Sequence, residues 1–80
     1  MEPTIPEHEI DCLRLTTEDA DELAEAGDFA DGCDLLRGAQ YRAELLLEEG
    51  KPWAPALLDR YRWELEQFYA RNGYPTRRAG

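Results

Sequence analysis

Valine and serine are absent from this 80-residue sequence, and lysine, histidine and methionine occur once each. The absence of serine excludes serine-based nucleophilic catalysis, and a single histidine leaves little for acid–base chemistry near neutral pH. Leucine, alanine and glutamate dominate with 11, 10 and 11 residues, whereas β-branched residues amount to two isoleucines and four threonines. Strands favour branched side chains and helices favour Ala, Leu and Glu, so the composition predicts an all-α protein that is not an enzyme.

Basic residues are also scarce: 9 Lys and Arg stand against 18 Asp and Glu, which gives a formal net charge of −9. Such a chain binds nucleic acid or an anionic membrane poorly and is attracted to basic surfaces. Residues 1–50 carry 15 acidic and 3 basic residues, and residues 51–80 carry 3 acidic and 6 basic. The opposite charges of the two halves favour a hairpin at Gly50-Lys51-Pro52, although chance segregation explains the pattern as well.

The sequence has no run of about 18 apolar residues, the length that a membrane-spanning helix needs. The N-terminus, Met1–Thr4, has neither the basic nor the apolar region of a signal peptide. Two cysteines, Cys12 and Cys33, are expected as reduced thiols. We therefore expect a soluble, cytoplasmic protein.

The spacing of apolar residues predicts a small helical bundle that forms one domain over residues 1–80. Two long antiparallel helices are expected at about 28–49 and 54–71, joined by a tight turn. Asp28 is placed to cap the first of them, with Asp31 as its partner in a capping box.

A short helix is expected at about 17–26, with Thr16 or Thr17 as its cap. Two prolines and the lack of a clear period predict an extended arm over residues 1–15, in which a helical turn and a short strand stay open as alternatives. Residues 76–80 are expected as a flexible basic tail.

Glycines give further positional information. Gly27 and Gly50 follow the first two expected helices and predict their ends. Gly32 lies on the apolar stripe of the helix at 28–49, which indicates a close contact with another helix. Gly38 lies inside the same helix and costs it about 1 kcal/mol relative to Ala.

A stretch of about 13 residues contains Gly27-Asp28-Phe29 and then Gly32, Leu36 and Ala39. It resembles the turn and second helix of a tetratricopeptide repeat. The preceding helix carries other residues at the repeat's Trp, Leu-Gly and Tyr positions, namely Thr16, Asp19-Ala20 and Leu23, and the sequence holds no second copy. The resemblance is that of a generic helix hairpin and implies no binding groove.

Trp63 is the first candidate for a binding residue. At helical spacing it lies opposite the apolar stripe of the helix at 54–71, beside Asp59, Arg60 and Gln67. Trp and Arg are common in interface hot spots, so this group predicts contact with a partner. The alternative is that apolar residues of the arm fold back and bury Trp63; they are Ile5, Ile10, Leu13 and Leu15.

Tyr41 and Leu45 form a second apolar pair opposite the main stripe of their helix. We expect them to pack against the helix at 17–26, with a shared surface with Trp63 as the alternative.

Acidic residues cluster at the end of the first expected helix and the start of the second. The cluster comprises Glu18, Asp19, Asp21, Glu22, Glu25, Asp28, Asp31 and Asp34. A solvated face and a docking surface for a basic partner both fit it, whereas the spacing lacks the ligand pattern of a calcium loop. His8, Cys12 and Cys33 lack the paired spacing of a metal site, so no metal or cofactor is expected.

These observations predict a non-catalytic protein-binding module, a small acidic adaptor or inhibitor that docks on a basic protein through Trp63 and the acidic cluster. Two alternatives remain. One is an acidic mimic of nucleic acid that blocks the basic groove of a nucleic-acid-binding enzyme, as phage-encoded inhibitors of host defence do. The other is a homodimeric structural subunit, because so small a chain has a thin core.

Overall fold

Three helices make up the part of the chain that the computed structural model describes, residues 4–72. They are α1 (Glu7–Glu25), α2 (Phe29–Glu48) and α3 (Ala54–Arg71). The prediction of an all-α helical bundle is confirmed. The ranges expected for α2 and α3 were about 28–49 and 54–71. The expected tail at 76–80 lies outside the described residues.

The first helix is longer than the sequence suggested. α1 begins at Glu7, directly after Pro6. The extended arm over residues 1–15 is therefore wrong from residue 7 onward, where the helical alternative holds, and the helix expected at 17–26 begins ten residues earlier. A proline is tolerated just before the first helical turn, and the helix dipole favours Glu7 and Glu9 in that turn. The buried residues of α1 are Glu9, Leu13 and Ala20, which are spaced by four and seven residues on one helix face.

Neither expected N-terminal cap forms. Thr17 lies inside α1, where its hydroxyl donates a hydrogen bond to the carbonyl oxygen of Arg14 at 2.8 Å. Asp28 precedes α2, but its side chain makes no capping hydrogen bond, so the predicted capping box with Asp31 is wrong.

The predicted glycine stops are confirmed. Gly27 and Gly50 have positive φ angles of 94° and 87°, a conformation that costs glycine little because it has no Cβ. After Gly27, the N–H of Asp28 donates to the carbonyl oxygen of Leu23 at 2.8 Å, and an equivalent bond follows Gly50. These bonds satisfy carbonyl groups at the helix ends and turn the chain sharply back.

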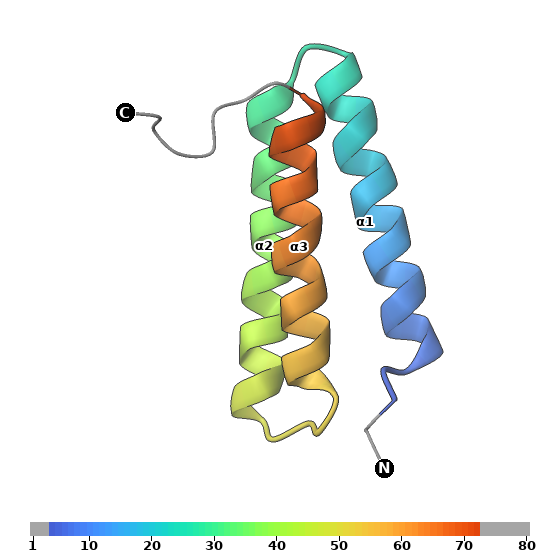
Figure 1. Ribbon diagram of the computed structural model, residues 1–80, viewed down its shortest axis with the longest axis vertical. Helices are drawn as coiled ribbons and strands as arrows, with labels where there is room; N and C mark the ends of the chain where they lie inside the picture. The colour runs from blue at the N-terminus through green and yellow to red at the C-terminus, as the bar shows by residue number, and fades with distance from the viewer. Residues whose placement is uncertain (1–3, 73–80) are drawn as a thin grey trace.

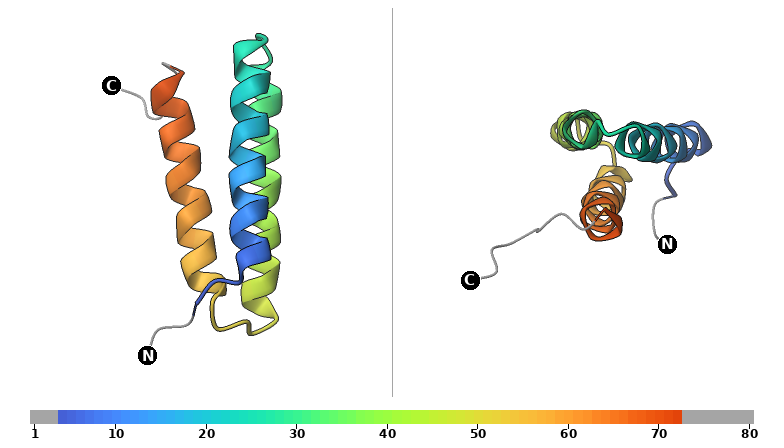
Figure 2. Two further views of the ribbon diagram at one scale, coloured as in Figure 1. Left: turned by 90° about the vertical axis from the view of Figure 1, so that its right-hand side faces the viewer. Right: turned by 90° about the horizontal axis from the view of Figure 1, so that it is seen from above.

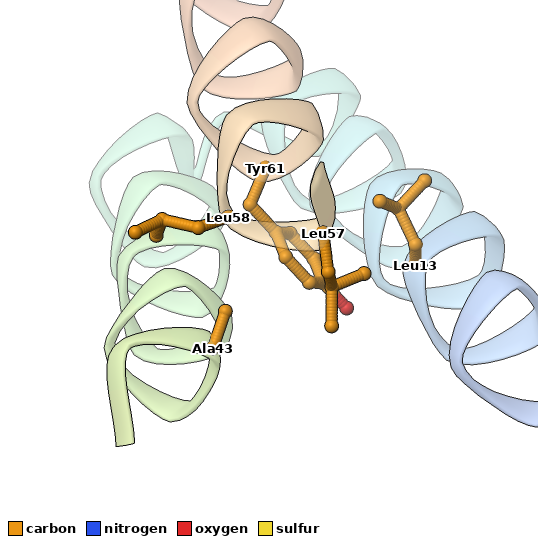
Figure 3. Packing of buried hydrophobic residues seen from close by; sticks show 5 residues of the cluster. All are labelled: Leu13, Ala43, Leu57, Leu58 and Tyr61. Carbon is orange, nitrogen blue, oxygen red and sulfur yellow. The ribbon is translucent and has the colours of Figure 1, made fainter. Parts of the chain in front are cut away.

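α1 and α2 lie side by side and antiparallel in one layer, and α3 lies against one face of that layer (Figures 1 and 2). Near the α2–α3 turn, the core consists of Leu13, Ala43, Leu57, Leu58 and Tyr61. Their side chains come from all three helices, and Leu58 points toward α2 (Figure 3). Near the α1–α2 turn, a second core cluster contains Ala20, Cys33, Leu36 and Phe68. The ring of Phe68 stacks on that of Phe29 with centroids 5.0 Å apart.

At Gly32, α2 lies in close contact with both other helices. A Cβ atom at this position would lie 2.7 Å from Cζ of Phe68 and 2.8 Å from the backbone oxygen of Ala20. Real Cβ contacts do not occur at these distances, and the oxygen belongs to the α1 backbone, which cannot rotate away. The close helix contact predicted from the sequence at Gly32 is therefore confirmed.

We expect Gly32→Ala to lower the free energy of unfolding by about 1–3 kcal/mol, because α1 and Phe68 must move to admit the methyl group. Urea unfolding followed by far-UV circular dichroism measures this change.

Gly38→Ala is the matched control in the same helix. A Cβ at Gly38 has no heavy atom within 4 Å, so alanine should raise the free energy of unfolding by about 0.5–1 kcal/mol. Stabilisation of similar size in both variants would show that the contact at Gly32 is not tight.

Candidate partner-binding surface

Trp63 lies on the outer face of α3. Its side chain is 50% exposed, whereas Tyr61, two residues and about 200° of helix rotation away, is buried. Since Tyr61 faces α1 and α2, Trp63 points away from them, as the helical spacing predicted. The alternative in which the N-terminal segment buries Trp63 is wrong, because Leu13 belongs to α1 and Ile5 packs against the core.

Arg60 holds a defined position beside the indole ring. Its guanidinium carbon lies 5.5 Å from the centroid of the Trp63 ring, within the range of a cation–π interaction. Its Nε donates a hydrogen bond to Oε2 of Glu64 at 3.1 Å. Glu64 is itself buried, which was not predicted for a charged residue. The buried carboxylate thus orients Arg60 over an exposed aromatic ring.

The other two residues predicted beside Trp63 have different surroundings. Asp59 is exposed, and its carboxylate lies 3.8 Å from the guanidinium of Arg62. Gln67 is half-buried on α3. We define the Trp63 surface as Trp63 with Asp59, Arg60 and Gln67.

The acidic cluster lies on α1, on the α1–α2 turn and on the first turns of α2. Trp63 points away from the layer that α1 and α2 form, whereas the acidic cluster lies on the helices of that layer and on the turn between them. Asp21 pairs with Arg71 at 3.0 Å. Seven members are exposed and form no ion pair within residues 4–72: Glu18, Asp19, Glu22, Glu25, Asp28, Asp31 and Asp34.

Tyr41 and Leu45 do not receive the first helix, contrary to the sequence-based expectation. Their side chains are 61% and 40% exposed. α1 instead packs on the side of α2 that carries Gly32. The pair was misplaced because periodicity shows that two stripes are apolar but not which stripe the neighbouring helix covers.

An ion pair between a buried carboxylate and a half-exposed arginine near the start of α1 was not predicted. Glu9 is only 2% exposed, and both of its carboxylate oxygens accept hydrogen bonds of 2.8 Å from the guanidinium of Arg42 on α2. His8 Nε2 lies 3.4 Å from the same carboxylate. The bonds from Arg42 hold the pKa of Glu9 below its ordinary value of 4.5, although burial opposes this shift.

The other reactive side chains lie apart from one another within residues 4–72. Among the described residues, no three His, Cys, Asp or Glu side chains lie close enough together to hold a metal ion. Cys12 is an exposed free thiol and Cys33 a buried one. None of the helices in the described part of the chain has an apolar stretch that could span a membrane.

Glu9→Gln should lower the free energy of unfolding at pH 7 by about 1–3 kcal/mol, because Gln lacks the charge and one of the acceptors that Arg42 binds. Since the pKa of Glu9 is lowered by folding, its contribution is complete above 4.5 and is lost as the pH falls through the lower, folded-state value. The stability difference between wild type and variant should therefore shrink in acid. Urea unfolding at several pH values measures it.

Glu7→Gln is the control, because Glu7 is exposed in the same helical turn and forms no ion pair within the described residues. We expect its stability to follow that of the wild type within about 0.5 kcal/mol at each pH. An equal loss in both variants would contradict a specific role for the Glu9–Arg42 pair.

Comparisons with known proteins give no information about these surfaces. No protein-family model, curated protein or solved structure matches the chain.

Proposed function

We propose that this protein is a non-catalytic protein-binding module that docks on a larger protein through the Trp63 surface. The observation that carries the proposal is the half-exposed Trp63 side chain with the Arg60 guanidinium over its ring. A large aromatic ring left half in water gains free energy when a partner covers it, at about 25 cal/mol per Å² of apolar area.

The contacts around Arg60 support this role. Binding normally costs side-chain entropy, because long side chains must be ordered in the interface. Arg60 is already tied to Glu64, whose carboxylate is buried, so part of this ordering is complete before a partner arrives. Trp and Arg together are the residue types that most often dominate binding energy at protein interfaces.

A second candidate function is mimicry of nucleic acid by the acidic cluster. It is favoured by the seven exposed carboxylates of the cluster that form no ion pair within residues 4–72. The dependence of binding affinity on salt concentration distinguishes the two functions. Affinity for a basic groove should fall steeply as ionic strength rises, whereas affinity that depends on Trp63 should change little.

The test is affinity capture from the native host with purified wild-type protein and Trp63→Ala as parallel baits. A true partner should be recovered by the wild type and reduced at least about tenfold with the variant, the loss expected of an interface hot spot. Binding between the two purified proteins, measured by calorimetry, should show the same difference.

Tyr41→Ala is the matched control, because Tyr41 is another exposed aromatic residue but lies on α2. It should recover the same partner as the wild type. Equal recovery by all three baits, each shown to be folded by circular dichroism, would contradict the proposal.

A further inference from the structure

One face of the layer formed by α1 and α2 is covered by α3, and no element of the described chain covers the opposite face (Figure 2). Helical phase places on this opposite face a row of α1 residues that includes Leu15, Asp19 and Glu22. It places a row of α2 residues there that includes Leu35 and Gly38. We call these five residues the α1–α2 face.

The α1–α2 face contains exposed apolar side chains. Leu15 and Leu35 are 53% and 38% exposed, although leucine is usually buried. A hollow of about 460 Å³ lies between the two helices and is lined by Leu23, Leu35, Asp19 and Glu22. Two leucines thus lie beside two carboxylates in one concave site.

At Gly38, the absence of a side chain allows a partner to approach the α2 backbone closely. A Cβ atom at Gly38 would find no heavy atom within 4 Å, so the space above the α2 backbone is empty there. Glycine on a helix surface allows the backbone of a second helix to approach closely. The glycine weakens α2 relative to alanine, and no packing contact within residues 4–72 requires it.

The charge of the layer defines what can cover it. α1 and α2 together carry 12 acidic and 3 basic residues, whereas α3 carries 3 of each. Two of the three basic side chains are engaged internally: Arg14 with Asp11 and Arg42 with Glu9. Asp19 and Glu22 form no ion pair within residues 4–72. Positive charge on the partner would therefore be attracted, and a second copy of this face would be repelled.

We propose that the α1–α2 face binds an amphipathic helix of a partner protein, with leucine-like residues on its apolar stripe and Lys or Arg along its flanks. The apolar stripe packs on Leu15, Leu35 and the gap at Gly38, as in helix-in-groove recognition. The aliphatic stem of a flanking Lys or Arg covers Leu23 in the hollow, and its charged end reaches Asp19 or Glu22. This surface is separate from the Trp63 surface, and the proposal does not require Trp63.

A pair of synthetic helical peptides of about 18 residues, or five turns, tests the proposal with the full chain. Both carry the same leucine stripe; the flanks of one are lysine and those of the other are glutamate. Fluorescence anisotropy at about 0.1 M salt should show binding of the lysine peptide at least about tenfold tighter than of the glutamate peptide.

Cys12 reports where the peptide binds. It is exposed on α1, three residues before Leu15, whereas Cys33 is buried. A saturating amount of the lysine peptide should slow alkylation of Cys12 by iodoacetamide at least about threefold, because the bound helix shields the thiol. Trp63→Ala should bind the peptide like the wild type, so a failure of this proposal and a failure of the Trp63 proposal are distinguishable.

Two variants test the chemistry of the face. Gly38→Gln fills the empty space without meeting another atom at its Cβ, so it should fold normally and weaken binding of the lysine peptide at least about tenfold. Asp19→Asn with Glu22→Gln should weaken binding about three- to tenfold.

The matched control for charge is Glu48→Gln with Glu49→Gln, which removes two exposed carboxylates at the other end of α2. It should change affinity by less than about twofold. Equal affinity for the two peptides, unchanged alkylation of Cys12, or normal binding by folded Gly38→Gln would each overturn the proposal.

Discussion

The close approach of α1 and α2 at Gly32 determines how the three helices share their surfaces. The missing side chain brings the backbone oxygen of Ala20 and the ring of Phe68 to the same spot, so one glycine positions both α1 and α3 against α2. At the other end of the layer, Arg42 binds Glu9 and fixes α1 against α2 again. With both ends fixed, α3 covers one face of the layer and leaves the other to solvent or to a partner.

The distribution of charge differs between the α1–α2 layer and α3. The helices of the layer carry a large excess of carboxylates, while α3 is balanced. The Trp63 surface on α3 is therefore suited to a contact that depends on apolar area and a cation–π pair, and the α1–α2 face to a contact that is steered by charge. Because Trp63 points away from the layer and the α1–α2 face lies on the far side of that layer from α3 (Figure 2), the two proposed contacts do not overlap.

The sequence predicted those features that depend on one residue type with one physical role. Gly27 and Gly50 end helices because of their backbone freedom, and Trp63 faces outward because the apolar stripe of α3 fixes its phase. The first ten residues of α1 were assigned to the arm because Glu9 occupies a core position, and a charged residue there interrupts the apolar period. Only its partner, Arg42, which lies 33 residues away, makes that position tolerable. The exposure of Tyr41 and Leu45 was likewise unpredictable, since it depends on which side of α2 packs against α1.

The exposed carboxylates alone do not supply much binding energy. An ion pair at a solvated surface contributes about 0–1 kcal/mol, because water already stabilises both charges and salt screens their attraction. At the α1–α2 face, most of the affinity must therefore come from covering Leu15 and Leu35, and the role of Asp19 and Glu22 is to select a basic partner and set its register. A helix with the right charge but no apolar stripe would meet the same carboxylates and dissociate quickly. The two leucines are what distinguish this face from an ordinary acidic surface.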